Sequence, residues 1–310
     1  MPYAYDYLLT GATGQIGRYF LRELLGKGKI AVIMRRDNAL AAAQELQKVA
    51  QKQPLEGVDV ILGDLNDCNL PVTKHIINAA AYTTLANVDH GRYWEDNILP
   101  AVRLAHHAET TGAVLHQMSS IAVAEFRKDK LTEDKDPIPN TNQLHYSISK
   151  CMVELAVRAV SKRAHIYRLG DVIPPMANME SDWRRNHWLP ILFMCGKEGF
   201  SHAPPDYGIW LADTAELAKA VVLLTSCDEP RYHVLGHLYH WKEFKGWALD
   251  RQTKMRAMGH WMTEIILHGP DGNDVDGTLT TQLLASKGFS WTTQGDTYWQ
   301  AFAKQSMIRR

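Results

Sequence analysis

Tyr146 and Lys150 stand four residues apart in the segment Tyr-Ser-Ile-Ser-Lys, and their side chains are of the types that proton transfer needs. In a helix this spacing places both side chains on one face. A phenol ionises near pH ~10 in water, and a neighbouring ammonium favours the phenolate and lowers that pKa. Tyr146 can then give a proton to a substrate oxygen while hydride reaches the adjoining carbon. We expect a catalytic pair; the alternative is two surface residues that share the spacing by chance.

Two serines, Ser119 and Ser120, directly follow the predicted strand Val114–Met118. A hydroxyl at this place can hold a substrate carbonyl oxygen beside the tyrosine. Serines are also frequent in turns, so a purely structural pair is the alternative.

Glycine stands at every third position between Thr10 and Gly17, in the segment Thr-Gly-Ala-Thr-Gly-Gln-Ile-Gly. This segment joins a short apolar strand, Tyr7–Leu9, to a predicted helix, Gln15–Leu25. Glycines permit a tight turn and let the backbone approach a pyrophosphate, while the helix N-terminus offers free N–H groups. We therefore expect a dinucleotide-binding turn with the contact residues Gly11, Thr13, Gly14, Gln15, Ile16 and Gly17.

Two arginines, Arg35 and Arg36, end the second predicted strand, Ile30–Met34. An acidic residue at such a strand end would bind the ribose 2′-hydroxyl of NAD, whereas a guanidinium suits the 2′-phosphate of NADP. The basic tip predicts NADPH as the cofactor. Asp37 is a competing feature, and two solvated surface arginines are the alternative.

Acidic and small residues follow the next two predicted strands. Asp64 and Leu65 come after Val58–Leu62, and the Asp64 carboxylate can bind an adenine edge; a turn aspartate is the alternative. The strand Lys74–Asn78 is followed by small residues that leave room for a cofactor lying flat across the strand ends: Ala79, Ala80 and Ala81. Lys150 can also bind the nicotinamide ribose.

The elements that must position these residues alternate between strand and helix, which predicts an α/β fold with a doubly wound, Rossmann-type parallel sheet. Pro100 must kink the predicted helix Arg92–Glu109 or mark its first turn. The other predicted elements are the helices Ala39–Lys52, Tyr146–Arg163 and Thr214–Leu224 and the strand Ala164–Leu169.

A smaller C-terminal substrate-binding region is expected, because eight of the nine tryptophans lie beyond residue 182 and the alternation weakens there. We divide the chain into an NADP-binding domain, residues 1–173 plus about 206–226, and a substrate region, about 174–205 and 227–310.

The motifs occur in the order typical of one family, and the chain resembles the extended short-chain dehydrogenase/reductases. The supporting segments are Thr10–Gly17, Gly63–Leu65, Asn78–Ala81, Ser119–Ser120, Tyr146–Lys150 and Arg168–Pro174. The resemblance implies that Ser120, rather than Ser119, is catalytic, together with Asn97, and that Val172 and Ile173 contact the nicotinamide. It also implies an aspartate before a late helix, here Asp213, and a monomer or homodimer.

Within that family, four less specific motifs resemble those of the thioester-reductase branch. This branch includes the terminal reductases of carboxylic acid reductases and nonribosomal peptide synthetases. The four motifs are Gly17–Leu25, Met34–Arg36, Arg231–Val234 and Leu284–Phe289. The resemblance implies NADPH-dependent reduction of an acyl thioester, bound to a carrier protein or to coenzyme A, to an aldehyde or alcohol. The alternatives are a reductase of free ketones or aldehydes, an enzyme that modifies nucleotide sugars, and a non-catalytic NADP-sensing regulator.

Composition excludes other classes of function. The 310 residues carry 34 Lys plus Arg against 34 Asp plus Glu, so no excess charge draws the chain to nucleic acid. The sequence has no stretch of 18 apolar residues, so no membrane span is expected, and the N-terminus has no signal-peptide pattern. The four cysteines are far apart, which is typical of a cytoplasmic protein. The histidines lack convincing ligand spacing, so no metal is expected.

Overall fold

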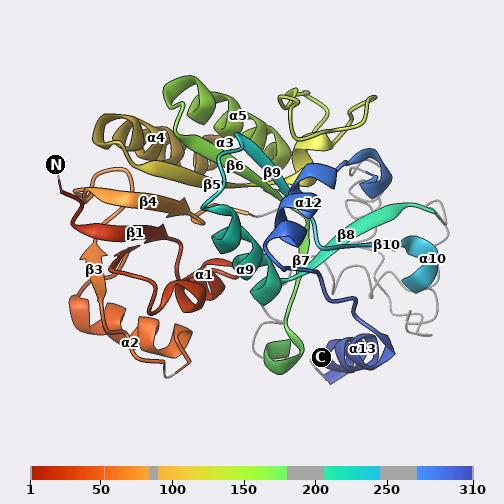
Figure 1. The fold of residues 1–310 in the computed structure, drawn as a ribbon, viewed down its shortest axis with the longest axis horizontal. Helices are drawn as coiled ribbons and strands as arrows, with labels where there is room; N and C mark the ends of the chain where they lie inside the picture. Colours follow the sequence, from red (N-terminus) through yellow and green to blue (C-terminus); the bar gives the residue numbers. More distant parts are fainter. Residues whose placement is uncertain (1, 52, 84–89, 180–205, 245–270, 309–310) are drawn as a thin grey trace.

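A seven-stranded parallel sheet forms the centre of the molecule (Figure 1). The computed structural model describes residues 2–51, 53–83, 90–179, 206–244 and 271–308. The strand order is β3-β2-β1-β4-β5-β6-β9, and every neighbouring pair runs parallel. The predicted Rossmann-type fold is therefore confirmed. The strands are β1 Tyr5–Thr10, β2 Ile30–Met34, β3 Val58–Leu62, β4 Thr73–Asn78, β5 Val114–Ser120, β6 Ala164–Leu169 and β9 Arg231–Val234.

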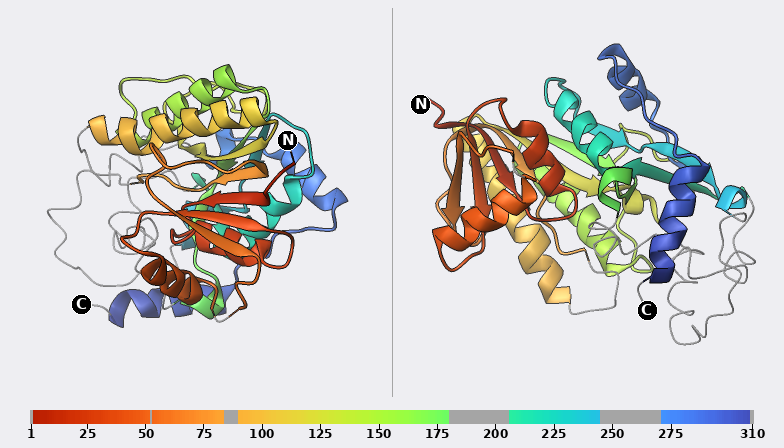
Figure 2. Two further views of the ribbon diagram at one scale, coloured as in Figure 1. Left: turned by 90° about the vertical axis from the view of Figure 1, so that its left-hand side faces the viewer. Right: turned by 90° about the horizontal axis from the view of Figure 1, so that it is seen from below.

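Helices cover both faces of this sheet, so that the core has three layers (Figure 2). On one face, α1 (Gly17–Leu24), α2 (Ala39–Val49) and α9 (Thr214–Leu224) bury their apolar sides in a cluster with strand residues such as Leu9 and Val32. On the other face, α4 (Leu99–Thr111) and α5 (His145–Val160) pack against Leu8, Ile76 and Leu115. Successive side chains of a strand point to opposite faces of the sheet. Because helices cover both faces, β2 is apolar throughout.

The predicted helix Arg92–Glu109 divides into three parts. It begins as α3 (His90–Tyr93), continues as the π-helical segment Trp94–Ile98, and becomes α4 with Pro100 in its first turn. Proline lacks a backbone N–H, so the first turn is a position that tolerates it. The predicted first-turn position is thus confirmed. The widened π segment, which the sequence did not predict, contains Asn97.

Several boundaries differ from the sequence-based ones. Ser119 and Ser120 are the last residues of β5 rather than the residues after it. The helix predicted from Gln15 begins at Gly17, and the one predicted to reach Arg163 ends at Val160. Helix ends are set by local hydrogen bonds that propensity alone does not resolve.

A second, three-stranded sheet lies beyond the carboxyl ends of the main strands. It consists of β7 (Asp171–Ile173), β8 (Gly208–Asp213) and β10 (His237–His240), with β8 in the middle. The later elements are α10 Trp241–Phe244, α12 Thr278–Ser286 and α13 Asp296–Ile308. Strand β9, inside the range predicted as substrate region, is the edge strand of the main sheet. Residues 180–205, part of that predicted region, lie outside the described residues.

Across the ranges that the structure describes, no helix is both long and apolar enough to cross a lipid bilayer.

Candidate active site and cofactor pocket

The glycine-rich turn between β1 and α1 can be built only from glycine at two positions. Gly11 has φ +68°, and a Cβ there would lie 2.7 Å from the carbonyl carbon and oxygen of Ala79. A Cβ on Gly17 would lie 2.0 Å from the Gly11 carbonyl oxygen. The apolar side chain of Ile16 at the N-cap of α1 offers no oxygen to the first helical N–H groups. The turn therefore presents bare backbone, which is what a pyrophosphate requires.

A pocket of about 300 Å³ opens beside this turn, which we call the glycine-turn pocket. It brings together ten of the predicted cofactor residues, from the ends of four strands: Gly11, Thr13, Gly14, Arg35, Arg36, Asp64, Leu65, Ala79, Ala80 and Ala81. The Thr10 hydroxyl donates to Asn78 Oδ1 at 2.6 Å and accepts from Ala80 N at 3.2 Å, which locks the first and fourth strand ends together. The small side chains, the glycine cradle and the basic rim fit a dinucleotide.

The remaining predicted cofactor residues lie elsewhere. Gln15 and Ile16 form the end of the turn, and Ile16 packs on the core. Val172 and Ile173 lie on β7, where the Ile173 carbonyl accepts a 2.7 Å bond from Thr214. Sequence reasoning missed Arg92 and Asp96, which line the glycine-turn pocket and pair with each other at 3.2 Å. Their spacing of four residues was the available signal.

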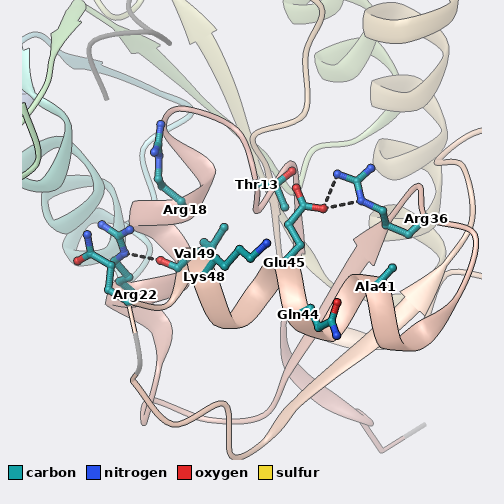
Figure 3. A pocket seen from close by; sticks show the side chains of 10 residues that line it. Thr13, Arg18, Arg22, Arg36, Ala41, Gln44, Glu45, Lys48 and Val49 are labelled. Carbon is teal, nitrogen blue, oxygen red and sulfur yellow. Dashed lines mark hydrogen bonds and ion pairs between the residues drawn. The ribbon is translucent and has the colours of Figure 1, made fainter. Parts of the chain in front are cut away.

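The two arginines at the rim are held by carboxylates. Arg35, whose side chain is 70% exposed, has Nη1 3.3 Å from Asp96 Oδ1 and 3.5 Å from Asp64 Oδ2. Arg36 forms an ion pair with Glu45 on α2 (Figure 3). Its Nη1 also donates to the Arg35 carbonyl at 2.8 Å. Asp64, which was predicted to bind adenine, therefore also contacts Arg35, which was predicted to bind the 2′-phosphate.

The predicted catalytic side chains meet where β5 ends and α5 begins. The Ser120 hydroxyl lies close enough to the Tyr146 phenol to lower the pKa of that phenol. Lys150, only 4% exposed, points into the same region: its Nζ lies 5.7 Å from the Tyr146 ring centroid and donates to the Met118 carbonyl at 3.2 Å. The structure thus brings these three side chains together.

Burial dominates the protonation of this group. It raises the pKa of Tyr146 to about 12, although the Ser120 hydroxyl opposes the rise. It lowers the pKa of Lys150 to about 8, against the attraction of the Glu154 carboxylate. The expected lowering of the Tyr146 pKa by the ammonium is not found, because burial is the largest influence on this phenol and raises its pKa. Tyr146 therefore carries its proton at neutral pH, and that proton is available for transfer to a substrate oxygen.

Asn97 braces the backbone around the site. Its Oδ1 accepts from Tyr82 N at 2.6 Å, and its Nδ2 donates to the Tyr82 carbonyl at 3.0 Å and to Ser149 Oγ at 3.2 Å. Ser149 in turn donates to the Tyr146 carbonyl at 2.7 Å. Asn97 thereby ties the segment after β4 to the first turn of α5. This arrangement makes it a positioning residue.

Ser119 differs from its neighbour, because it donates to Glu154 Oε1 at 2.6 Å and is buried. Glu154 also accepts from Arg168 Nε and Nη2, at 3.1 and 2.8 Å, and both charged side chains are 0% exposed. Sequence reasoning missed this pair. The available signals were a charged residue inside the apolar strand β6 and a carboxylate one turn after Lys150 on α5.

Two further expectations concern the rest of the chain. Asp213 caps α9 as the aspartate before a late helix, accepting from Ala215 N at 2.8 Å and Glu216 N at 3.2 Å. In the described residues, no three His, Cys, Asp or Glu side chains gather in a way that could hold a metal ion.

Comparison with known proteins places the chain among dinucleotide-binding enzymes. The profile of the NAD dependent epimerase/dehydratase family matches residues 7–189. No curated protein matches the sequence.

Solved structures share the fold over almost the whole chain. The reductase domain of the aureusimine biosynthetic cluster is 20% identical, with a TM-score of 0.78 over 98% of this chain and 90% of that one. A thiolation-reductase di-domain from an archaeal non-ribosomal peptide synthetase is 17% identical, with a TM-score of 0.74 over 97% and 74%. DesIV from Streptomyces venezuelae, a dTDP-glucose 4,6-dehydratase with NAD bound, is 17% identical, with a TM-score of 0.66 over 98% of each chain.

Proposed function

The chain belongs to the NAD dependent epimerase/dehydratase family, and we propose that within this family it is an NADPH-dependent reductase of an acyl thioester, producing an aldehyde or an alcohol. The observation that carries the proposal is the group formed by Ser120, Tyr146 and Lys150 where β5 ends and α5 begins. The glycine-turn pocket also supports the proposal, because most of its residues follow the carboxyl ends of β1 to β4, and Ser120 ends β5 of the same parallel sheet. Ligands of such sheets bind at the carboxyl ends of the strands.

Each side chain has a distinct part in the reaction. The reduced nicotinamide, when bound, supplies a hydride to the thioester carbonyl carbon. Tyr146 gives its proton to the carbonyl oxygen while Ser120 orients that oxygen, and Lys150 binds the nicotinamide ribose. Breaking the carbon–sulfur bond then releases a thiol and leaves an aldehyde. We propose that Val172 and Ile173 contact the nicotinamide.

The proposed cofactor is NADPH because Arg35 and Arg36 stand at the rim of the glycine-turn pocket. A guanidinium binds a phosphate with charge-assisted, parallel hydrogen bonds.

A carrier-bound or coenzyme A-bound acyl group is the proposed substrate. Its support is the shared fold with reductase domains of biosynthetic assembly lines, one of them joined to a thiolation domain. We propose a monomer or homodimer in the cytoplasm, a reducing compartment that suits the free thiols of Cys68, Cys151 and Cys227.

A second candidate is reduction of a free ketone or aldehyde, or modification of a nucleotide sugar. The family match and the shared fold with a dTDP-glucose 4,6-dehydratase favour the nucleotide-sugar alternative. A non-catalytic NADP sensor is disfavoured, because it would not need Ser120 beside the Tyr146 phenol or a buried lysine next to both.

The test is a substrate panel with the purified chain and NADPH. We expect acyl-coenzyme A or carrier-bound thioesters to consume NADPH. One thiol should be released for each hydride transferred when the product is the aldehyde, and one thiol for every two hydrides when the aldehyde is reduced further to the alcohol. Consumption with free ketones or nucleotide sugars alone would move the assignment to the second candidate.

A further inference from the structure

A second pocket of about 480 Å³ lies between α1 and α2 and shares residues with the glycine-turn pocket (Figure 3). We call it the α1–α2 groove. Its lining residues are Thr13, Arg18, Arg22, Arg36, Ala41, Gln44, Glu45, Lys48, Val49 and Gln51. Thr13 and Arg36 line both pockets, so the groove continues from the rim where a ribose 2′ substituent would emerge.

The groove is strongly basic. Four of its lining residues are cationic, Arg18, Arg22, Arg36 and Lys48, and Glu45 is the sole carboxylate among those ten. Arg22 is committed to the protein, since its Nε donates to the Val49 carbonyl at 2.7 Å and its guanidinium lies 4.6 Å from the Tyr19 ring centroid. The excess of positive charge favours a phosphate over a neutral hydroxyl.

Glu45 occupies the side of Arg36 that a phosphate would use. One carboxylate oxygen contacts both Nε and Nη2 of Arg36, while Nη1 is bonded to the Arg35 carbonyl. This is the forked face through which a guanidinium binds phosphate oxygens. A 2′-phosphate must therefore share Arg36 with Glu45 or displace it, and the two negative charges repel each other.

The two rim arginines differ in this respect. Arg35 faces away from the groove toward Asp64 and Asp96, which line only the glycine-turn pocket. Arg36 is the arginine that belongs to both pockets. Arg36 is thus the better placed of the two to contact a 2′-phosphate.

We propose that Glu45 sets the preference between NADPH and NADH by competing with the 2′-phosphate of the cofactor for Arg36. This inference rests on the proposed function for its cofactor. Glu45 limits the affinity for NADPH and leaves NADH nearly unaffected, because NADH brings no second anion to Arg36.

The test is calorimetric titration of Glu45→Gln with NADPH, NADH and 2′,5′-ADP. The variant keeps the size of the side chain and removes its charge. We expect NADPH and 2′,5′-ADP to bind about fivefold more tightly, the upper range for an exposed ion pair, and NADH to change less than about twofold. Glu23→Gln is the matched control, because Glu23 on α1 is a similarly exposed carboxylate, lies outside both pockets, and pairs at 3.6 Å with Lys27, which follows the helix. It should change none of the three affinities.

Two results would overturn the role of Glu45: an unchanged ratio of NADPH to NADH affinity in Glu45→Gln, or weaker NADPH binding, which would mean that Glu45 holds Arg36 in its productive position. Failure of the proposed cofactor looks different. If the wild type binds NADH alone and Glu45→Gln gains NADPH, the cofactor assignment falls while the role of Glu45 stands.

Discussion

The two ends of the proposed cofactor site are built on opposite principles. At the proposed catalytic end, Lys150, Glu154 and Arg168 are buried, and their polar atoms have partners within the protein. At the proposed adenosine end, the side chains of Arg35 and Arg36 are 70% and 43% exposed and pair with surface carboxylates. Buried charges demand complete pairing, whereas exposed ion pairs contribute little and can exchange partners. The reactive geometry is therefore rigid, and the cofactor preference can be tuned.

The buried Glu154–Arg168 pair at the proposed catalytic end is also linked by hydrogen bonds to distant parts of the chain. Arg168 donates to the Lys135 carbonyl at 2.8 Å and lies 3.1 Å from His233 Nε2 on β9. His233 Nδ1 is 2.6 Å from the Asp276 carbonyl, just before α12. Through Ser119 and Glu154, the end of β5 is thus fixed to the loop before α5 and to the C-terminal part of the chain.

The largest expected effect is at the phenol. Tyr146→Phe should lower turnover by about 10²–10⁴-fold, because it removes the proton donor while leaving the glycine-turn pocket intact. Turnover and cofactor affinity should be measured on the same protein. Tyr5→Phe is the control, since Tyr5 lies at the start of β1 and bonds to Asp59. Full turnover in Tyr146→Phe would exclude the proposed donor.

Breaking the buried ion pair should cost stability. Glu154→Gln leaves Arg168 buried without a counter-charge, so we expect the free energy of unfolding in urea to fall by about 3–5 kcal/mol. The exposed pair of Glu23 and Lys27 provides the contrast: Glu23→Gln should change this free energy by less than about 0.5 kcal/mol. Similar losses in both variants would contradict the distinction between buried and exposed ion pairs.

A third effect concerns three histidines on neighbouring strands of the main sheet, namely His75 on β4, His116 on β5 and His165 on β6. His116 is fully buried, with its ring nitrogens 3.1 Å from His75 and 2.8 Å from the Tyr167 hydroxyl, and its ring packs against His165. Burial lowers the pKa of all three below the usual ~6.5. As the pH falls below that value, the three histidines therefore bind protons in the unfolded chain but stay neutral in the folded chain.

Unfolding free energy should accordingly decline between about pH 7 and 5, by on the order of 1 kcal/mol for each histidine. His116→Asn should flatten this decline, whereas His106→Asn, at an exposed position of α4, should keep it. Denaturation series at several pH values measure both slopes. An identical slope in wild type and His116→Asn would contradict the interpretation.

The smallest effect is expected at the exposed rim. Arg35→Ala should weaken NADPH binding about threefold, less than Arg36→Ala, since Arg35 is largely solvated and already paired with two carboxylates. Turnover at saturating NADPH should stay at the wild-type value. A larger loss for Arg35 than for Arg36 would reverse their assignment.

The contrast between the ends also explains what the sequence could predict. Gly11, Gly17, Tyr146 and Lys150 act through short spacings along the chain, so their positions were predictable. The Glu154–Arg168 pair depends on α5 lying over β6, and the Arg36–Glu45 pair depends on how α2 returns to β2. Such contacts arise from tertiary packing.

The second sheet and the π-helical segment were unpredictable for related reasons. Strand β7 has three residues and pairs with β8, which lies more than thirty positions later in the chain. The π-helical segment is fixed by the bonds of Asn97 to Tyr82 and Ser149, none of which is local. Short elements with distant partners leave a weak periodic signal.

The structure of the complex with NADPH tests the central claim most directly. We predict the nicotinamide beside the Tyr146 phenol, a ribose hydroxyl within about 3 Å of Lys150 Nζ, and the pyrophosphate over the backbone of the glycine-rich turn. A nicotinamide bound away from Tyr146, with its ribose out of reach of Lys150, would contradict the proposed chemistry.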